Sequence, residues 1–142
     1  MQFYIKDMGT KVFVNLPVKD LEKSKEFFAK LGFTFNAQFT DKNAACMVIS
    51  EENYAMLLVE PFFKTFTKKE IVNAKLNTEV LVALSSESKE NVDKMIKNAL
   101  DTGAKEASEP HDHGFMYGRS FEDLDGHIWE IFWMDPKVIV PS

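Results

Sequence analysis

Hydrophobic and polar positions follow two different periods along the first half of the chain. Alternation with a period of two predicts β-strands, and apolar residues three and four positions apart predict a helix that begins after Asp20 and ends at Gly32. Asp20 is a typical N-cap residue, and glycine is typical just past the end of a helix. The predicted strands of this half cover residues 11–18, 33–39, 44–50 and 54–60.

The second half repeats the same order of elements. A second amphipathic helix is predicted after Ser86 or Ser88 and ends at Gly103. Asp125-Gly126 predicts a β-hairpin turn, and Pro110–Gly114 predicts a loop. The predicted strands cover residues 79–85, 105–109, 115–122 and 127–134.

Each half therefore has the order β-α-β-β-β, which indicates an internal duplication. We expect one domain over residues 1–142, with a first module at 10–60, a connecting segment at 61–77 and a second module at 78–136. Within the connecting segment, Thr67 would cap a short helix through about Lys75. The predicted fold class is α+β, with the modules forming a curved eight-stranded mixed sheet around a central cleft. The alternative is an α+β sandwich without duplication.

Composition narrows the function classes. The chain has 142 residues, a formal net charge of −5 and a single arginine, which is unfavourable for binding nucleic acid. No apolar run is long enough to span a membrane, and the N-terminus lacks the apolar core of a signal peptide. The one cysteine, Cys46, precludes an intrachain disulfide, so a cytoplasmic location is expected.

Two segments resemble a known superfamily. Residues 14–33 (VNLPVKDLEKSKEFFAKLGF) and 121–132 (FEDLDGHIWEIF) are similar to the opening and the close of the glyoxalase, bleomycin-resistance and extradiol-dioxygenase (vicinal oxygen chelate) superfamily. Leu124 stands where that family's closing motif has proline. The chain looks most like uncharacterised bacterial members labelled predicted lactoylglutathione lyases. The resemblance implies the duplicated fold and a homodimer.

The resemblance also implies a divalent metal, held by His and Glu from the first and last strands of each module. The matching positions in this chain are Phe13, Leu58, Leu81 and Glu130. The first three have no lone pair to donate, and a metal needs three or four ligands. We therefore expect no metal and no other cofactor. If a divalent metal does bind, Glu130, His113 and His111 are the expected ligands.

Glu130 is the strongest single candidate for a functional residue. Strand alternation places it on one face with Ile128 and Phe132, in an otherwise apolar and aromatic strand. A carboxylate there would be a candidate catalytic base, a ligand-binding group or a remnant metal ligand. The structural alternative is a core glutamate paired with Arg119.

Further residues are candidates for contacting a ligand. Met116, Tyr117 and Arg119 would suit a small planar or anionic ligand, although Arg119 would instead pair with Glu130 or Glu122 in a purely structural reading. Asn15 is either a ligand-binding group or a strand-edge residue. Phe13, Leu58 and Leu81 are expected to line the apolar cleft in place of metal ligands. Cys46 is expected to be a small core residue, and His127 a surface residue of the hairpin.

Three functions remain open at this point. The first is a superfamily member that binds a small amphipathic molecule in an apolar cleft without the usual metal. The alternative is a metal-dependent, lactoylglutathione lyase-like isomerase that uses Glu130 and a relocated histidine ligand. The third is a regulatory or partner-binding dimer with no small-molecule ligand. Whether the chain is an enzyme is left open, with a lyase, isomerase or dioxygenase relative as the enzymatic reading.

Overall fold

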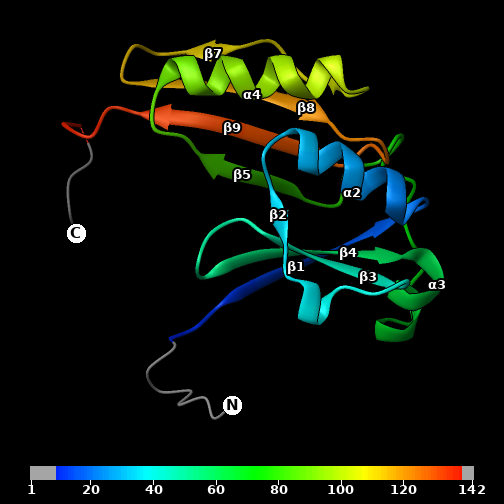
Figure 1. The fold of residues 1–142 in the computed structure, drawn as a ribbon. Coiled ribbons are helices and arrows are strands. Elements are labelled where there is room, and N and C mark those ends of the chain that lie inside the picture. The colour runs from blue at the N-terminus through cyan, green and yellow to red at the C-terminus, as the bar shows by residue number, and fades with distance from the viewer. Residues whose placement is uncertain (1–8, 139–142) are drawn as a thin grey trace. The chain divides into compact units, whose positions relative to one another are not determined.

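The computed structural model describes residues 9–138, which form two compact units that divide between Ile71 and Val72 (Figure 1). The first unit has a four-stranded sheet in the order β1-β4-β3-β2, with β1 parallel to β4. Its elements are β1 (Val12–Val18), α2 (Leu21–Lys30), β2 (Thr34–Phe35), the 3₁₀ helix η1 (Ala37–Phe39), β3 (Ala44–Val48), β4 (Asn53–Val59), α3 (Glu60–Phe63) and the 3₁₀ helix η2 (Lys64–Phe66).

The second unit has a five-stranded sheet in the order β5-β9-β8-β6, and β7 also pairs with β8. The central β8 and β9 are antiparallel, whereas β5 runs parallel to β9. Its elements are β5 (Leu81–Ser85), α4 (Lys89–Asp101), β6 (Lys105–Glu106), β7 (His111–Asp112), β8 (Met116–Glu122) and β9 (Ile128–Met134).

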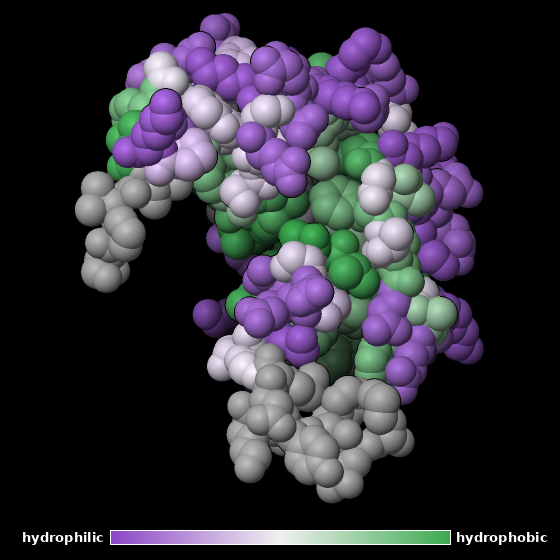
Figure 2. All heavy atoms as spheres, turned by 60° about the vertical axis from the view of Figure 1, so that its left-hand side comes forward, coloured by the Kyte–Doolittle hydropathy of each residue, from purple (hydrophilic) through white to green (hydrophobic). Residues whose placement is uncertain are grey.

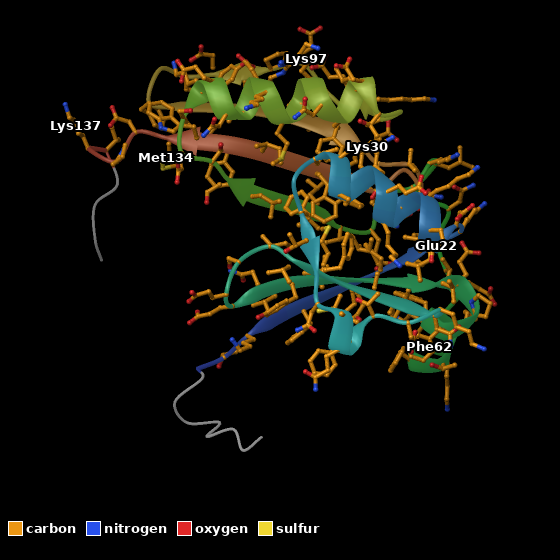
Figure 3. All side chains as sticks on the ribbon, in the orientation of Figure 1. Glu22, Lys30, Phe62, Lys97, Met134 and Lys137 are labelled. Carbon is orange, nitrogen blue, oxygen red and sulfur yellow. The ribbon has the colours of Figure 1, made fainter. Side chains whose placement is uncertain are left out.

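Helix α2 begins and ends where the sequence predicted. The Asp20 carboxylate accepts a hydrogen bond from the Lys23 N–H at 3.1 Å, which satisfies one of the free donors of the first turn. Figure 3 shows Glu22 and Lys30 toward opposite ends of this helix, where their charges complement the helix dipole. The buried face carries Phe27 and Phe28, each 1% exposed, which anchor the core of the first unit.

Helix α4 is the corresponding element of the second unit. The Ser88 hydroxyl accepts a hydrogen bond from the Asn91 N–H at 3.1 Å, so Ser88 rather than Ser86 is the cap. Val92, Ile96 and Ala99 are fully buried on the face that packs against β8 and β9, while Lys97 extends from the outer side (Figure 3).

Two predictions in the first half were wrong in their detail. The strand expected over 33–39 is limited to Thr34–Phe35, because the Asn36 side chain accepts from the Gln38 N–H at 2.9 Å and starts the 3₁₀ turn η1. No helix occurs over 67–75, where Thr67 and Asn73 side chains instead accept hydrogen bonds from nearby backbone N–H groups. The short helix in the connecting segment is α3, which has Pro61 in its first turn.

One expected loop is a strand. Within Pro110–Gly114, His111 and Asp112 form β7 and pair with Gly118 and Tyr117 of β8. Proline and glycine mark the two ends of this short edge strand rather than a continuous loop.

The mixed α+β class is confirmed, with two mixed sheets of four and five strands. A single eight-stranded curved sheet stays a prediction. Hydrophilic residues cover much of the surface visible in Figure 2, and apolar residues also reach it. Several large apolar side chains of the described residues are exposed by half or more, and these are Val12, Phe39, Phe66, Leu76 and Leu81.

Replacing Gly126 by alanine is expected to destabilise the second unit by about 2 kcal/mol or more. Gly126 has a φ of +93°, and an added Cβ would lie 2.7 Å from the Lys75 backbone nitrogen. Chemical denaturation measures the loss. The matched control is Gly32→Ala, at a φ of +104° with no heavy atom within 4 Å of the added Cβ, which should cost only about 1–2 kcal/mol. Equal losses in both variants would contradict the role of the close contact.

Candidate functional site

The register between β8 and β9 determines which side chains face each other. Ser120 lies opposite Glu130, and Gly118 lies opposite Phe132. Because side chains alternate along a strand, one face of the sheet carries Met116, Gly118, Ser120, Glu130 and Phe132, and the other carries Tyr117, Arg119, Phe121, Trp129 and Ile131. Helix α4 packs on the second face, so the first is the face available for a site.

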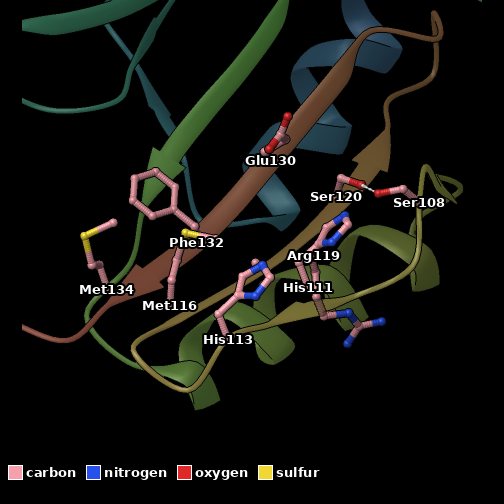
Figure 4. A pocket seen from close by; sticks show the side chains of 10 residues that line it. Ser108, His111, His113, Met116, Arg119, Ser120, Glu130, Phe132 and Met134 are labelled. Atoms are coloured by element: carbon pink, nitrogen blue, oxygen red, sulfur yellow. Dashed lines mark hydrogen bonds between the residues drawn. The ribbon is translucent and has the colours of Figure 1, made fainter.

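A pocket of about 400 Å³ lies over the first face (Figure 4). Its volume falls within the range of small-molecule sites. The apolar part of its lining consists of two thioethers and a phenyl ring, and the polar part of imidazoles, hydroxyls and one carboxylate. The lining residues are Ser108, His111, His113, Met116, Gly118, Arg119, Ser120, Glu130, Phe132 and Met134.

Glu130 brings the carboxylate into this pocket. Its side chain is partly buried, and it makes no hydrogen bond or ion pair with any of residues 9–138. The hydroxyl of Ser120, directly across the strand pair, is bonded to the Ser108 hydroxyl at 2.9 Å instead (Figure 4). Glu130 therefore combines apolar surroundings with an unused hydrogen-bonding capacity.

Arg119 is not the partner of Glu130, contrary to the structural alternative drawn from the sequence. It lies opposite Ile131, one position out of register, so its side chain extends to the α4 face. There its guanidinium donates to Asp93 at 3.1 Å and to Glu106 at 2.6 Å, and the bond to Glu106 raises the pKa of Arg119. The positive charge of Arg119 is therefore paired on the α4 face and does not balance the Glu130 carboxylate.

Tyr117 also faces α4. Its hydroxyl donates to Asp93 at 2.6 Å, and burial, together with this bond, raises the pKa of Tyr117. Lys89 lies 5.9 Å from the Tyr117 ring and 5.5 Å from the Trp133 ring, and its ammonium is 3.6 Å from Asp112. Tyr117 and Arg119 thus hold α4 on the sheet and are separated from Met116 and Glu130.

His111 of β7 and His113, which directly follows this strand, border the pocket together. The extended backbone at His111 places both imidazoles along one side, with ring centroids 6.5 Å apart and planes 15° from parallel. The His113 ring also lies 6.3 Å from that of Phe115. In Asp112, between them, the hydrogen bond from the Gly114 N–H lowers the pKa, and Lys89 acts in the same direction.

The remaining predicted site residues lie elsewhere. In the first unit, Phe13 stacks on Tyr54 with centroids 4.7 Å apart, and the Asn15 amide donates to the Phe13 carbonyl at 3.4 Å. Leu58 shares their sheet face and is 2% exposed. Leu81 is 53% exposed on β5 and does not line the pocket described above. None of these four residues is brought together with Glu130 in that pocket.

Asp123 is a structural residue that the sequence reasoning missed. Its buried carboxylate accepts hydrogen bonds from the Asp125 and His127 N–H groups at 3.0 Å and from the Trp129 indole at 2.9 Å. Burial raises the pKa of Asp123, and the neighbouring His127, the Trp129 indole and the Asp125 N–H oppose that rise. The sequence signal that could have identified this residue is the Asp123-Leu-Asp125-Gly126 motif. An aspartate at the start of such a turn can accept hydrogen bonds from the backbone N–H groups of the turn.

The predictions for His127 and Cys46 had different outcomes. His127 was expected to be a surface or hairpin residue; it lies in the turn between β8 and β9, where its N–H donates to the Asp123 carboxylate at 3.0 Å, but it is only 9% exposed. Cys46 is buried within β3, as expected of a small core residue, and burial raises the pKa of its thiol. No helix in the described part of the chain is long and apolar enough to cross a membrane.

The donor set does not fit the divalent metal that the superfamily resemblance implies. Across residues 9–138, no three His, Cys, Asp or Glu side chains are grouped to hold one ion. His111, His113 and Glu130 border the same pocket without forming such a group.

Comparisons with known proteins agree with this fold. The family model for the bleomycin resistance protein-like N-terminal domain matches residues 10–50. The solved structure of a glyoxalase/bleomycin resistance protein/dioxygenase family enzyme from Burkholderia phytofirmans PsJN is 16% identical, covers 86% of this chain and 96% of its own, and has a TM-score of 0.71. Residues 10–50 thus resemble the bleomycin resistance protein-like N-terminal domain, and the chain shares the fold of this glyoxalase/bleomycin resistance protein/dioxygenase family enzyme.

Two further structures are similar over most of the chain. Hypothetical protein SA1046 from S. aureus is 29% identical, with coverage of 87% of this chain and 92% of its own and a TM-score of 0.74. The fosfomycin resistance protein FosX from Listeria monocytogenes is 17% identical, with coverage of 92% of both chains and a TM-score of 0.64. No curated protein matches the chain. These similarities show that the chain shares its fold with all three structures.

Replacing Asp123 by asparagine is expected to lower the free energy of unfolding by about 1–3 kcal/mol. In the wild type, both carboxylate oxygens of Asp123 accept hydrogen bonds from N–H donors. In the asparagine variant, an NH₂ group replaces one of these oxygens and would face a donor instead of an acceptor. Urea denaturation measures this loss. Glu79→Gln removes the same charge from an exposed position of the same unit and should stay within about 0.5 kcal/mol. A loss no larger in Asp123→Asn than in this control would contradict the assigned role.

Proposed function

We propose that the chain binds a small amphipathic molecule in the pocket formed by β7, β8 and β9, without the metal usual in the superfamily. The observation that carries the proposal is the carboxylate of Glu130, partly buried beside apolar side chains and unpaired with any described residue. Such a group is costly for folding unless a ligand pairs with it.

The lining gives the ligand two environments. Met116, Phe132 and Met134 offer thioether and aromatic surface for an apolar body. Glu130 and the imidazoles of His111 and His113 offer polar contacts that fix its orientation. Of the residues proposed from the sequence, Met116 and Glu130 keep a direct binding role, while Tyr117 and Arg119 support the sheet from its other face.

A second candidate is a metal-dependent, lactoylglutathione lyase-like isomerase, with Glu130 as base and a relocated histidine ligand. It is favoured by one observation, that His111 and His113 both border the pocket of Glu130. The absence of a three-residue donor group among residues 9–138 weighs against it.

Assembly and location complete the proposal. We infer a homodimer, because β1 and β5 each end the strand order of their sheet, and an unpaired edge favours pairing with a second chain. A curved eight-stranded mixed sheet with a central cleft, and a cytoplasmic location, also remain part of this proposal.

Filling the pocket should abolish binding without unfolding the protein. Gly118 lines the pocket, and an added Cβ meets its nearest heavy atom, the Phe132 Cβ, at 3.6 Å, which is ordinary contact. Gly118→Val should therefore retain a cooperative unfolding transition while weakening binding of the neutral probe N-phenyl-1-naphthylamine about tenfold or more. Fluorescence titration and thermal unfolding measure the two effects.

Two variants control this experiment. Gly118→Ala adds a single methyl group and should weaken binding less than Gly118→Val. Phe39→Ser removes a ring that is 57% exposed and should leave the affinity unchanged, since Phe39 lies outside the pocket. The proposal is wrong if the folded wild type binds no probe, or if Gly118→Val binds it as well as the wild type does.

The two candidate functions differ in metal content. We expect protein purified without chelators to hold far less than one metal ion per chain and to leave the methylglyoxal–glutathione hemithioacetal unconverted. Elemental analysis and a spectrophotometric assay test both points. One ion of Ni, Zn, Mn or Fe per chain, lost in both His113→Ala and Glu130→Ala, would instead establish the second candidate's metal site.

A further inference from the structure

The sign of the charge in the pocket of β7, β8 and β9 restricts its ligand further. Two lining residues carry a formal charge, Arg119 and Glu130. The Arg119 guanidinium is bound by two carboxylates on the α4 face, at 3.1 Å and 2.6 Å. Only the carboxylate of Glu130 remains on the pocket face, so the local potential is negative, in a chain whose net charge is already −5.

We propose that the ligand is a cationic amphiphile, whose ammonium- or guanidinium-type group pairs with Glu130 and whose apolar body lies against Met116, Phe132 and Met134. This inference rests on the proposed function and names the chemical class of its ligand.

The pairing is favourable because Glu130 has no competing partner. No described residue donates a hydrogen bond to its carboxylate, so a ligand N–H replaces water alone. Glu130 is partly buried in a pocket that also carries apolar side chains, which strengthens the attraction of opposite charges relative to an exposed pair.

The apolar side chains also suit a cation better than an anion. A phenyl face attracts a cation through its quadrupole, and the thioether sulfurs are polarisable. The imidazoles of His111 and His113 add flat rings, 15° from parallel, against which a planar group packs. Among the described residues that line the pocket, an anionic ligand would meet the carboxylate of Glu130, while the guanidinium of Arg119 is already paired with Asp93 and Glu106.

Three naphthylamine probes that differ in charge test the inference. They are the neutral N-phenyl-1-naphthylamine, the cationic N-(1-naphthyl)ethylenediamine and the anionic 1-anilinonaphthalene-8-sulfonate. At a pH of about 8, the cation should bind the wild type at least about tenfold more tightly than the anion. Calorimetric titration of the full chain measures each affinity.

Glu130→Gln keeps the shape of the side chain and removes its charge. It should weaken binding of the cationic probe about tenfold and change binding of the neutral probe by less than about twofold. Glu122→Gln is the matched control, because Glu122 lies on the same face of β8, is also partly buried and does not line the pocket. This control should leave all three affinities within about twofold, which separates direct pairing from the effect of net charge.

The outcomes distinguish this inference from the function beneath it. If neither the neutral nor the cationic probe binds the wild type, the proposed function itself is wrong. If the neutral probe binds and Gly118→Val abolishes its binding, but the cation binds no better than the anion, the binding function stands and this inference is overturned. It is also overturned if Glu130→Gln and Glu122→Gln weaken cation binding equally.

Discussion

The register between β8 and β9 is the constraint on which the rest of the second unit depends. The buried carboxylate of Asp123 fixes the start of the connecting turn through two backbone N–H groups and the Trp129 indole. A slip of one residue would exchange the two faces of both strands. The indole of Trp129 and the aliphatic Ile131 would leave the α4 face, and the carboxylate of Glu130 would enter the core. One turn therefore decides both the packing of the helix and the chemistry of the pocket.

The same constraint explains what could be predicted from the sequence. The alternation around Glu130 is strict, so its face could be assigned without a structure. The N-cap of α2 at Asp20 could also be predicted, and that of α4 could be narrowed to Ser86 or Ser88, because local hydrogen bonds decide helix caps. The partner of Arg119 could not, since a cross-strand pair depends on register, and register is a non-local property. Ser120 lies opposite Glu130, and Arg119, one residue earlier in β8, lies opposite Ile131 on the other face of the sheet.

Other parts of the site depend on contacts that no local pattern reveals. Pro110 and Gly114 correctly indicate breaks in regular structure, but the two residues of β7 are extended only because β8 supplies hydrogen-bonding partners. The resemblance to a known superfamily singled out Phe13, Leu58 and Leu81 by their positions in the sequence, but it did not show how they lie relative to one another in space. The structure within each unit shows Leu58 buried and Leu81 exposed, so apolar type alone did not distinguish core from surface.

The two sides of the second sheet use their charges in opposite ways. On the α4 face, the guanidinium of Arg119 is paired twice, and Asp93 also accepts from Tyr117, so the polar groups hold a helix in place. On the pocket face, the hydroxyls of Ser108 and Ser120 satisfy each other, which leaves the Glu130 carboxylate without a donor among the described residues. A sequence selected for stability alone would do better with an apolar or paired residue at position 130, because an unpaired, partly buried carboxylate weakens folding. The residues around it form no group of three metal donors within the described part of the chain. A donor brought by a ligand is thus the simplest physical reason for a carboxylate at that place.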